Sequence, residues 1–307
     1  MRLGVTAVVV LLGASLLPSV VRADGCMFPD EAAWRRMRER SMINEPEQKA
    51  VVFFSKGKED LIISPSYEGP TDRFAWVIPV PKRPKLEILK GAIFHELAAL
   101  VRPRPRDQAK AGAPAMGIPG GVTVLERKTV GAYDVSVLLA TDGQALMKWL
   151  KANKYHLPSK AVGPITHYVK EGWTFVACRV KAPSAAKGLR TGTLAPIRLT
   201  FAAQRPVYPL RLSSANPKPF STLVYLILPT GEEGERTGLV KLASGPGGYG
   251  GYGIYRSAAL ARGQKRYPTL ARLTRDEADV YVSRGQLQPK DCTADYVWEV
   301  SSRRAAR

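Results

Sequence analysis

The chain has 307 residues, of which 45% are hydrophobic and 23% charged, a composition typical of a globular protein that buries a core. Lysine and arginine outnumber aspartate and glutamate by 46 to 26, which gives a formal net charge of +20. After the N-terminus no stretch approaches 18 uncharged apolar residues, which excludes a second membrane-spanning helix.

Residues 1–23 have the three parts of a secretory signal peptide: Arg2, an uncharged apolar stretch over 3–17, and Val21-Arg22-Ala23 as a cleavage site. Cleavage leaves 284 residues with a formal net charge of +18. An uncleaved anchor is disfavoured because Gly and Pro interrupt the stretch, and a lipidated Cys26 because Ala23-Asp24-Gly25 lacks the usual aliphatic residue. We therefore predict an exported protein of the periplasm or the extracellular cell surface.

The basic excess favours acidic partners, which outside the cytoplasm are anionic envelope polymers or lipid head groups. Export argues against nucleic acid as the acidic partner. Most basic residues are scattered, as on a merely solvated surface, and the denser groups are 82–85, 102–106 and 303–304.

The first half of the chain after the signal predicts one short helix, three strands and a longer helix. The helix-like piece is 31–40, and the strands 49–55 and 60–66 flank a glycine-containing turn, typical of a hairpin. Strand 73–80 has Phe74, Trp76 and Ile78 on one face, and its prolines predict that it ends there or lies at an edge. An apolar stripe of period 3.6 predicts a helix over 86–101.

The second half follows a Pro- and Gly-rich segment, 102–121, which we interpret as a loop between two halves. Strands are predicted at 122–128 and 132–140, and a capping box at 141–144 predicts a helix that ends near Asn153. A helix at 159–171 is predicted to be interrupted by Gly163-Pro164. Further strands are predicted at 173–181, 194–202, 207–212 and 222–228.

Strand and helix runs cluster rather than alternate, which predicts an α+β fold with mostly antiparallel strands in two halves and two to four helices. The predicted organisation is a signal peptide (1–23), an N-terminal segment (24–48), a main α+β domain (49–230, halves 49–101 and 122–230) and a C-terminal extension (231–307). The extension contains a low-complexity Gly/Tyr-rich loop, 245–253.

No catalytic, cofactor or metal motif is complete. His95-Glu96 lacks the second histidine of the zinc-protease motif, because Ala99 stands there, so we predict a solvent-facing His95. His156 and His167 have no ligand partner at metal-site spacing. The glycines at 245–250 match a dinucleotide fingerprint, but no helix pattern follows them. We predict no catalytic residue, no cofactor and no metal.

The three cysteines are the most informative chemical groups. Cys178 lies on the apolar face of a predicted strand and is predicted to be a buried thiol. Cys26 and Cys292 lie near the two ends of the mature chain and form the candidate disulfide, which an oxidising compartment permits. A free or lipidated Cys26 stays open.

The landmarks of the chain, in this order, resemble those of a bacterial family of exported proteins, the domain-of-unknown-function family 2330. The resemblance spans Cys26 to Pro229 and rests on Asp24-Gly25-Cys26, 48–54, 66–69, 74–81, 130–135, 145–150, 168–177 and 208–212. It implies a bacterial envelope protein and no established activity. Some family members end in a membrane helix, whereas this chain ends in Ser301-Ser-Arg-Arg-Ala-Ala-Arg307.

Three functions remain as hypotheses. The first is a non-enzymatic exported envelope protein, a binding or structural module. The alternative is an exported hydrolase that uses carboxylates from separate strands, for which Glu68, Asp72 and Asp134 are merely available. The third is a scaffold subunit that pairs through strand 73–80.

Overall fold

A computed structural model of the chain describes residues 25–69, 73–89, 92–101, 129–130, 133–139, 143–181, 190–230, 237–244, 253–254, 256–261, 265–274 and 277–302. The predicted signal peptide, the predicted loop 102–121, the predicted strand 122–128 and most of the Gly/Tyr-rich loop lie outside these residues. Among the described residues, no helix is long and apolar enough to cross a membrane.

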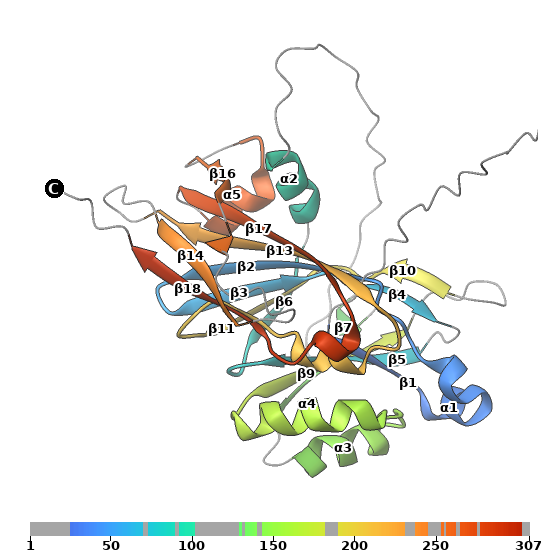
Figure 1. The fold of residues 1–307 in the computed structure, drawn as a ribbon. Coiled ribbons are helices and arrows are strands. Elements are labelled where there is room, and N and C mark those ends of the chain that lie inside the picture. The colour runs from blue at the N-terminus through green and yellow to red at the C-terminus, as the bar shows by residue number, and fades with distance from the viewer. Residues whose placement is uncertain are drawn as a thin grey trace, which may run out of the picture.

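Two large β-sheets form the centre of the fold (Figure 1). The five-stranded sheet has the order β1 (Cys26–Pro29), β5 (Arg73–Val80), β9 (Thr174–Lys181), β8 (Tyr133–Leu139), β7 (Thr129–Val130). The seven-stranded sheet has the order β16 (Arg256–Leu260), β17 (Ala278–Leu287), β13 (Phe220–Pro229), β2 (Glu47–Ser55), β3 (Lys58–Ile63), β11 (Ile197–Ala202), β6 (Lys85–Ile88).

Two smaller sheets complete the strands. One pairs β4 (Ser66–Gly69) with β10 (Arg190–Thr193), and the other has the order β12 (Val207–Tyr208), β18 (Tyr296–Ser302), β14 (Thr237–Ser244), β15 (Gly253–Ile254). The pair β13–β2 is parallel and the other strand pairs are antiparallel. The predicted α+β class with mostly antiparallel strands is confirmed.

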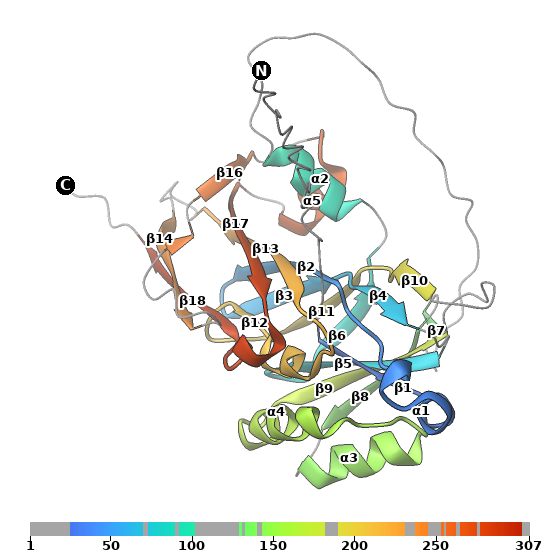
Figure 2. The same ribbon diagram turned by 45° about the vertical axis from the view of Figure 1, so that its right-hand side comes forward.

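Helices cover the outer faces of the two large sheets, so the molecule has four layers (Figures 1 and 2). Helices α3 (Gly143–Ala152) and α4 (Ser159–Lys170) pack on the five-stranded sheet, and α2 (Ile93–Leu100) and α5 (Pro268–Thr274) pack on the seven-stranded sheet. The remaining short elements are α1 (Glu31–Met37), η1 (Arg38–Ser41), η2 (Arg211–Ala215) and η3 (Pro289–Asp291).

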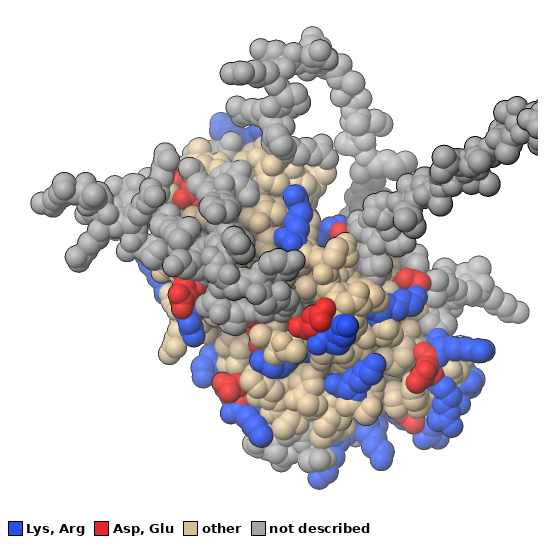
Figure 3. Space-filling view, viewed as in Figure 1, with Lys and Arg blue, Asp and Glu red and all other residues tan. Residues whose placement is uncertain are grey.

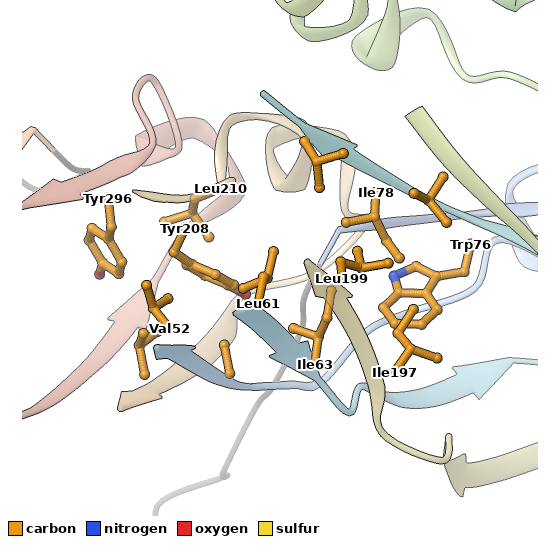
Figure 4. Close-up of a cluster of buried hydrophobic side chains, with 14 of the residues drawn as sticks. Val52, Leu61, Ile63, Trp76, Ile78, Ile197, Leu199, Tyr208, Leu210 and Tyr296 are labelled. Atoms are coloured by element: carbon orange, nitrogen blue, oxygen red, sulfur yellow. The ribbon is translucent and has the colours of Figure 1, made fainter. Parts of the chain in front are cut away.

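The central core lies between the two large sheets (Figure 4). Along β5, Trp76 and Ile78 enter this core, whereas Val77 points to the opposite face and packs beneath α3 and α4. Leu61 and Ile62 of β3 divide in the same way between the core and the α2–α5 layer. Successive strand residues face opposite sides, and strands that are buried on both sides therefore have continuous apolar sequences.

The four-stranded sheet closes one end of the central core. Tyr208, Tyr296 and Trp298 are buried there, and the first two lie beside Leu61 and Val52 in Figure 4. The C-terminal residues therefore contribute directly to the main core.

The predicted hairpin is confirmed, with a shorter turn than expected. Lys58 and Glu59 pair with Ser55 and Phe54, which leaves Lys56-Gly57 as a two-residue turn. Both turn residues have positive φ, 48° and 73°, as a type I′ turn requires.

Three predicted elements differ from the structure. The helix predicted over 86–101 is shorter, because residues 85–88 pair with β11 as a strand and α2 begins at Ile93. The strand predicted at 207–212 ends at Tyr208, because Pro209 has no N–H to donate, and a 3₁₀ turn follows. Helix α4 continues through Pro164, since its buried residues hold it against the five-stranded sheet.

Candidate functional site

All three cysteines are buried free thiols in this structure. Burial raises the pKa of Cys178, and it raises the pKa of Cys292 to about 12. Burial and the nearby Glu45 carboxylate raise the pKa of Cys26. The predicted buried thiol is therefore observed at Cys178, and none of the three is a nucleophilic thiolate at neutral pH.

The predicted disulfide between Cys26 and Cys292 is not formed in this structure. Cys26 packs with the α3–α4 layer, and Cys292 packs in the central core. The two side chains therefore lie in different hydrophobic clusters of the same folded body.

The histidines do not form a metal site in the described part of the chain, where no group of three or more His, Cys, Asp or Glu side chains comes together. His95 is exposed on α2, as predicted. Its neighbour Glu96 is buried and accepts hydrogen bonds from the backbone N–H groups of Thr269 (3.0 Å) and Leu270 (2.9 Å). Glu96 therefore caps α5, a role that the sequence pattern did not indicate.

Two buried carboxyl groups, those of Asp295 and Glu59, accept hydrogen bonds from structural partners. Asp295 Oδ1 accepts from Tyr168 Oη (2.5 Å) and from the backbone N–H groups of Leu210 and Arg211 (2.8 Å each). Glu59 Oε2 accepts from the backbone N–H of Val207 at 2.9 Å. These contacts join chain segments that are distant in sequence.

The acids that the sequence left available for hydrolysis do not converge either. Glu68 lies 3.6 Å from Lys218, and Asp134 lies 3.6 Å from Arg179. Asp72 lies outside the described residues. The described structure therefore brings no pair of these carboxylates together.

A basic surface with an aromatic pair lies around α1. We define this surface, the α1 corner, by Trp34, His156 and six basic residues: Arg35, Arg36, Arg38, Arg40, Arg73 and Lys154. Three acidic residues lie in the same stretch: Asp30, Glu31 and Glu39. Figure 3 shows Lys and Arg side chains gathered where α1 lies in Figure 1.

Helix α1 is fixed to the connection between α3 and α4. Asp30 caps the helix by accepting from the backbone N–H of Ala33 at 2.7 Å. The backbone N–H of Glu31 donates to the Lys154 carbonyl oxygen (2.8 Å), and that of His156 donates to the Pro29 carbonyl oxygen (3.0 Å). The short helix is thus held by tertiary contacts, since seven residues are too few for independent stability.

The aromatic pair joins the same two segments. The rings of Trp34 and His156 stack with centroids 3.6 Å apart and an interplanar angle of 7°. Burial lowers the pKa of His156, the Glu31 charge opposes this shift, and the Arg38 charge adds to it. The imidazole is therefore neutral at neutral pH, and both rings remain partly exposed.

The arginines of the α1 corner are exposed. Arg35 bonds Glu31 one turn earlier on the helix at 3.1 Å. An exposed pair of this kind contributes well under ~1 kcal/mol to stability. The Arg35 guanidinium is therefore available to an external ligand at small cost.

Two basic residues of the α1 corner have left-handed backbone conformations. Arg38 has φ 53° and ψ −132°, and Lys154 has φ 63°. Lys154 ends α3 in the hydrogen-bonding pattern with which Gly172 ends α4. Glycine adopts this conformation without strain, whereas a residue with a side chain is destabilised by about 1–2 kcal/mol. The corner therefore keeps basic side chains at positions where stability alone favours glycine.

Sequence reasoning did not single out the α1 corner. The arginines at 35–40 belong to a predicted helix, and their density there is a sequence signal for a basic surface. Of the denser groups that were noted, 102–106 and 303–304 lie outside the described residues, and Lys85 is paired with Glu87 at 2.9 Å. The approach of Lys154 and Arg73 to α1 follows from tertiary structure alone.

A cavity lies on the opposite side of the molecule, beside α2 and α5. Its volume is about 320 Å³, and it is lined by Ile88, Leu89, Ile93, Arg198, Thr269, Arg272 and Leu273. No carboxylate lines it. It does not have the paired acids that a hydrolase of the predicted kind requires.

Comparison with known proteins identifies a family. A family model described as an uncharacterized protein conserved in bacteria (DUF2330) matches residues 36–234. No protein of curated function matches the chain. The crystal structure of baculovirus P35 aligns with 83% of this chain and 92% of that chain at 9% identity and a TM-score of 0.34.

Proposed function

The chain belongs to the DUF2330 family of bacterial proteins, and we propose that it is an exported, non-enzymatic envelope protein that binds anionic lipid head groups through the α1 corner. The observation that carries this proposal is the gathering of exposed arginines around the Trp34–His156 stack. The proposed location is the periplasm or the cell surface, which rests on the signal-peptide pattern of residues 1–23.

The side-chain types of the α1 corner suit phosphate at a membrane surface. Five of its six basic residues are arginines, whose planar guanidinium groups bind phosphate oxygens in pairs. Tryptophan favours the membrane–water interface because its ring is apolar and its N–H is polar. The left-handed Arg38 and Lys154 add support, because their side chains are kept at a cost in stability.

The other hypotheses receive less support from the described residues. For the hydrolase, Glu68 and Asp134 are each paired with a basic residue, and Glu59 and Asp295 accept hydrogen bonds from backbone groups. The scaffold hypothesis required strand 73–80 to be an open edge, and this is wrong: β5 lies between β1 and β9.

Vesicle binding tests the proposal. The purified mature protein is co-sedimented with phosphatidylglycerol vesicles and, separately, with phosphatidylcholine vesicles at low ionic strength. We expect binding to the anionic vesicles alone. Each basic residue near an anionic surface contributes ~1 kcal/mol, so Arg36→Gln combined with Arg40→Gln should weaken binding about 30-fold.

A matched double variant controls for net charge. Lys58→Gln with Arg205→Gln removes the same charge near the β2–β3 turn, which lies at the opposite side of the molecule from α1 (Figure 1). It should bind nearly as the unaltered protein does. Equal losses in both double variants, or no binding to anionic vesicles, would refute the proposed site. Binding to soluble polyphosphate in place of vesicles would assign the surface to an envelope polymer.

A further inference from the structure

The cavity beside α2 and α5 has an apolar lining with two arginines. Ile88 and Leu89 come from the end of β6, Ile93 from the start of α2, and Leu273 from the last turn of α5. Its volume of about 320 Å³ falls at the lower end of the ~300–1,000 Å³ range of small-molecule sites. The cavity thus suits a small ligand with an apolar body.

Arg198 is held in place at the cavity wall. Its guanidinium donates to Asp60 Oδ2 at 2.6 Å and to Glu87 Oε2 at 3.4 Å. These two carboxylates compensate its charge, and they disfavour a ligand that carries several negative charges. Arg198 therefore provides a rigid polar wall and little net attraction.

Arg272 differs from Arg198 in its partners. It is exposed on α5, and its Nε donates to the Pro268 carbonyl oxygen of its own helix at 3.3 Å. Among the described residues, no carboxylate forms an ion pair with its guanidinium. An exposed arginine without an ion-pair partner attracts a single anionic group at the cavity mouth.

We propose that the cavity binds a small amphipathic monocarboxylate, such as a medium-chain fatty acid. The apolar body lies against Ile88, Leu89, Ile93 and Leu273, and the carboxylate pairs with Arg272. This site shares no residue with the α1 corner. The result of the vesicle-binding experiment therefore does not bear on the proposed carboxylate site.

Calorimetry with decanoate, below its micelle concentration, tests this site in the mature protein. Decanol is the matched neutral ligand. We expect saturable decanoate binding, and affinity at least about tenfold weaker for decanol, because a charge-assisted contact is lost. Arg272→Gln should weaken decanoate binding by the same factor and leave vesicle binding unchanged.

Arg284→Gln is the control, because Arg284 is exposed on β17, close to the other edge of the same sheet. It should bind decanoate normally. Leu273→Asp places a carboxylate in the cavity lining and should abolish binding. Absence of saturable binding, equal affinity for decanol, or unchanged affinity in Arg272→Gln would each overturn the proposal.

Discussion

The buried Glu59 carboxyl predicts a specific pH dependence of stability. Burial raises the pKa of Glu59 well above its usual value, the Val207 N–H opposes that rise, and the Asp60 charge adds to it. The folded state therefore keeps its proton at a pH where the unfolded chain has already lost it. Between the unfolded and folded pKa values, the free energy of unfolding falls by ~1.4 kcal/mol per pH unit as pH rises.

Glu59→Gln removes this proton linkage. The amide oxygen can still accept from Val207 N–H, and the amide nitrogen replaces Oε1, which has no hydrogen-bond partner among the described residues. Relative to the unaltered protein, the variant should therefore gain ~1.4 kcal/mol for each pH unit in that window. Urea unfolding followed by fluorescence at several pH values above 4.5 measures the difference.

Glu87→Gln is the control of opposite sign. A hydrogen bond from Lys85 lowers the pKa of Glu87, so its contribution is present above the unfolded pKa and is lost as pH falls. The Glu87 side chain is 40% exposed, so this variant should lose less than ~1 kcal/mol at neutral pH. A stability difference for Glu59→Gln that does not change with pH would refute the reasoning.

The other predictions concern the left-handed backbone of Lys154, the hydrogen bonds to Asp295 and the three buried thiols. Lys154→Gly should raise the free energy of unfolding by about 0.5–1 kcal/mol, because relief of the left-handed strain exceeds the added chain entropy; a lower urea midpoint would contradict this. Asp295→Ala should lower the free energy of unfolding by about 3 kcal/mol or more, because three donors lose their acceptor. Tyr168→Phe removes one of these donors and should lower it by about 1–2 kcal/mol. Equal losses in the two variants would contradict the hydrogen bonds assigned to Asp295. Thiol titration of the protein purified without reductant should give no reaction while it is folded and three free thiols in denaturant; one free thiol would instead support the Cys26–Cys292 disulfide predicted from sequence.

Local patterns predicted much of the fold. The alternation of residues 73–80 correctly placed Phe74, Trp76 and Ile78 on one face, because strand geometry fixes that period. The hairpin was predictable because two strand-like runs flank a glycine-containing turn, whereas its two-residue length was not, since Lys56 has an unfavourable positive φ. The clustering of strands correctly indicated an α+β fold.

Non-local pairing limited the prediction elsewhere. Residues 85–88 carry an apolar stripe that continues into α2, and pairing with β11 is what makes them a strand. Residues 278–287 have no strong period, yet they form β17 beside the long strand β13. The stability of these strands comes from partners that are distant in sequence, which local propensity does not contain.

The candidate site was less predictable than the fold. A run of arginines at 35–40 is visible in the sequence, but Lys154 and His156 reach it through the packing of the α3–α4 connection against Pro29 and Glu31. Likewise, the side-chain partner of Glu96 is the start of α5, more than 170 positions away. Such contacts form only when the helix and sheet layers pack together, so local sequence patterns do not indicate them.

The most direct test of the central claim is quenching of tryptophan fluorescence by vesicles of brominated phosphatidylglycerol. Of the five tryptophans, Trp34 lies in the α1 corner, Trp76 and Trp298 are fully buried, and Trp149 and Trp173 are half-buried against the α3–α4 cluster. If the α1 corner binds the lipid surface, the vesicles should quench the unaltered protein, and Trp34→Phe should lose most of that quenching while it still binds. Quenching that persists in Trp34→Phe, or its absence in the unaltered protein, would contradict the proposed orientation on anionic head groups.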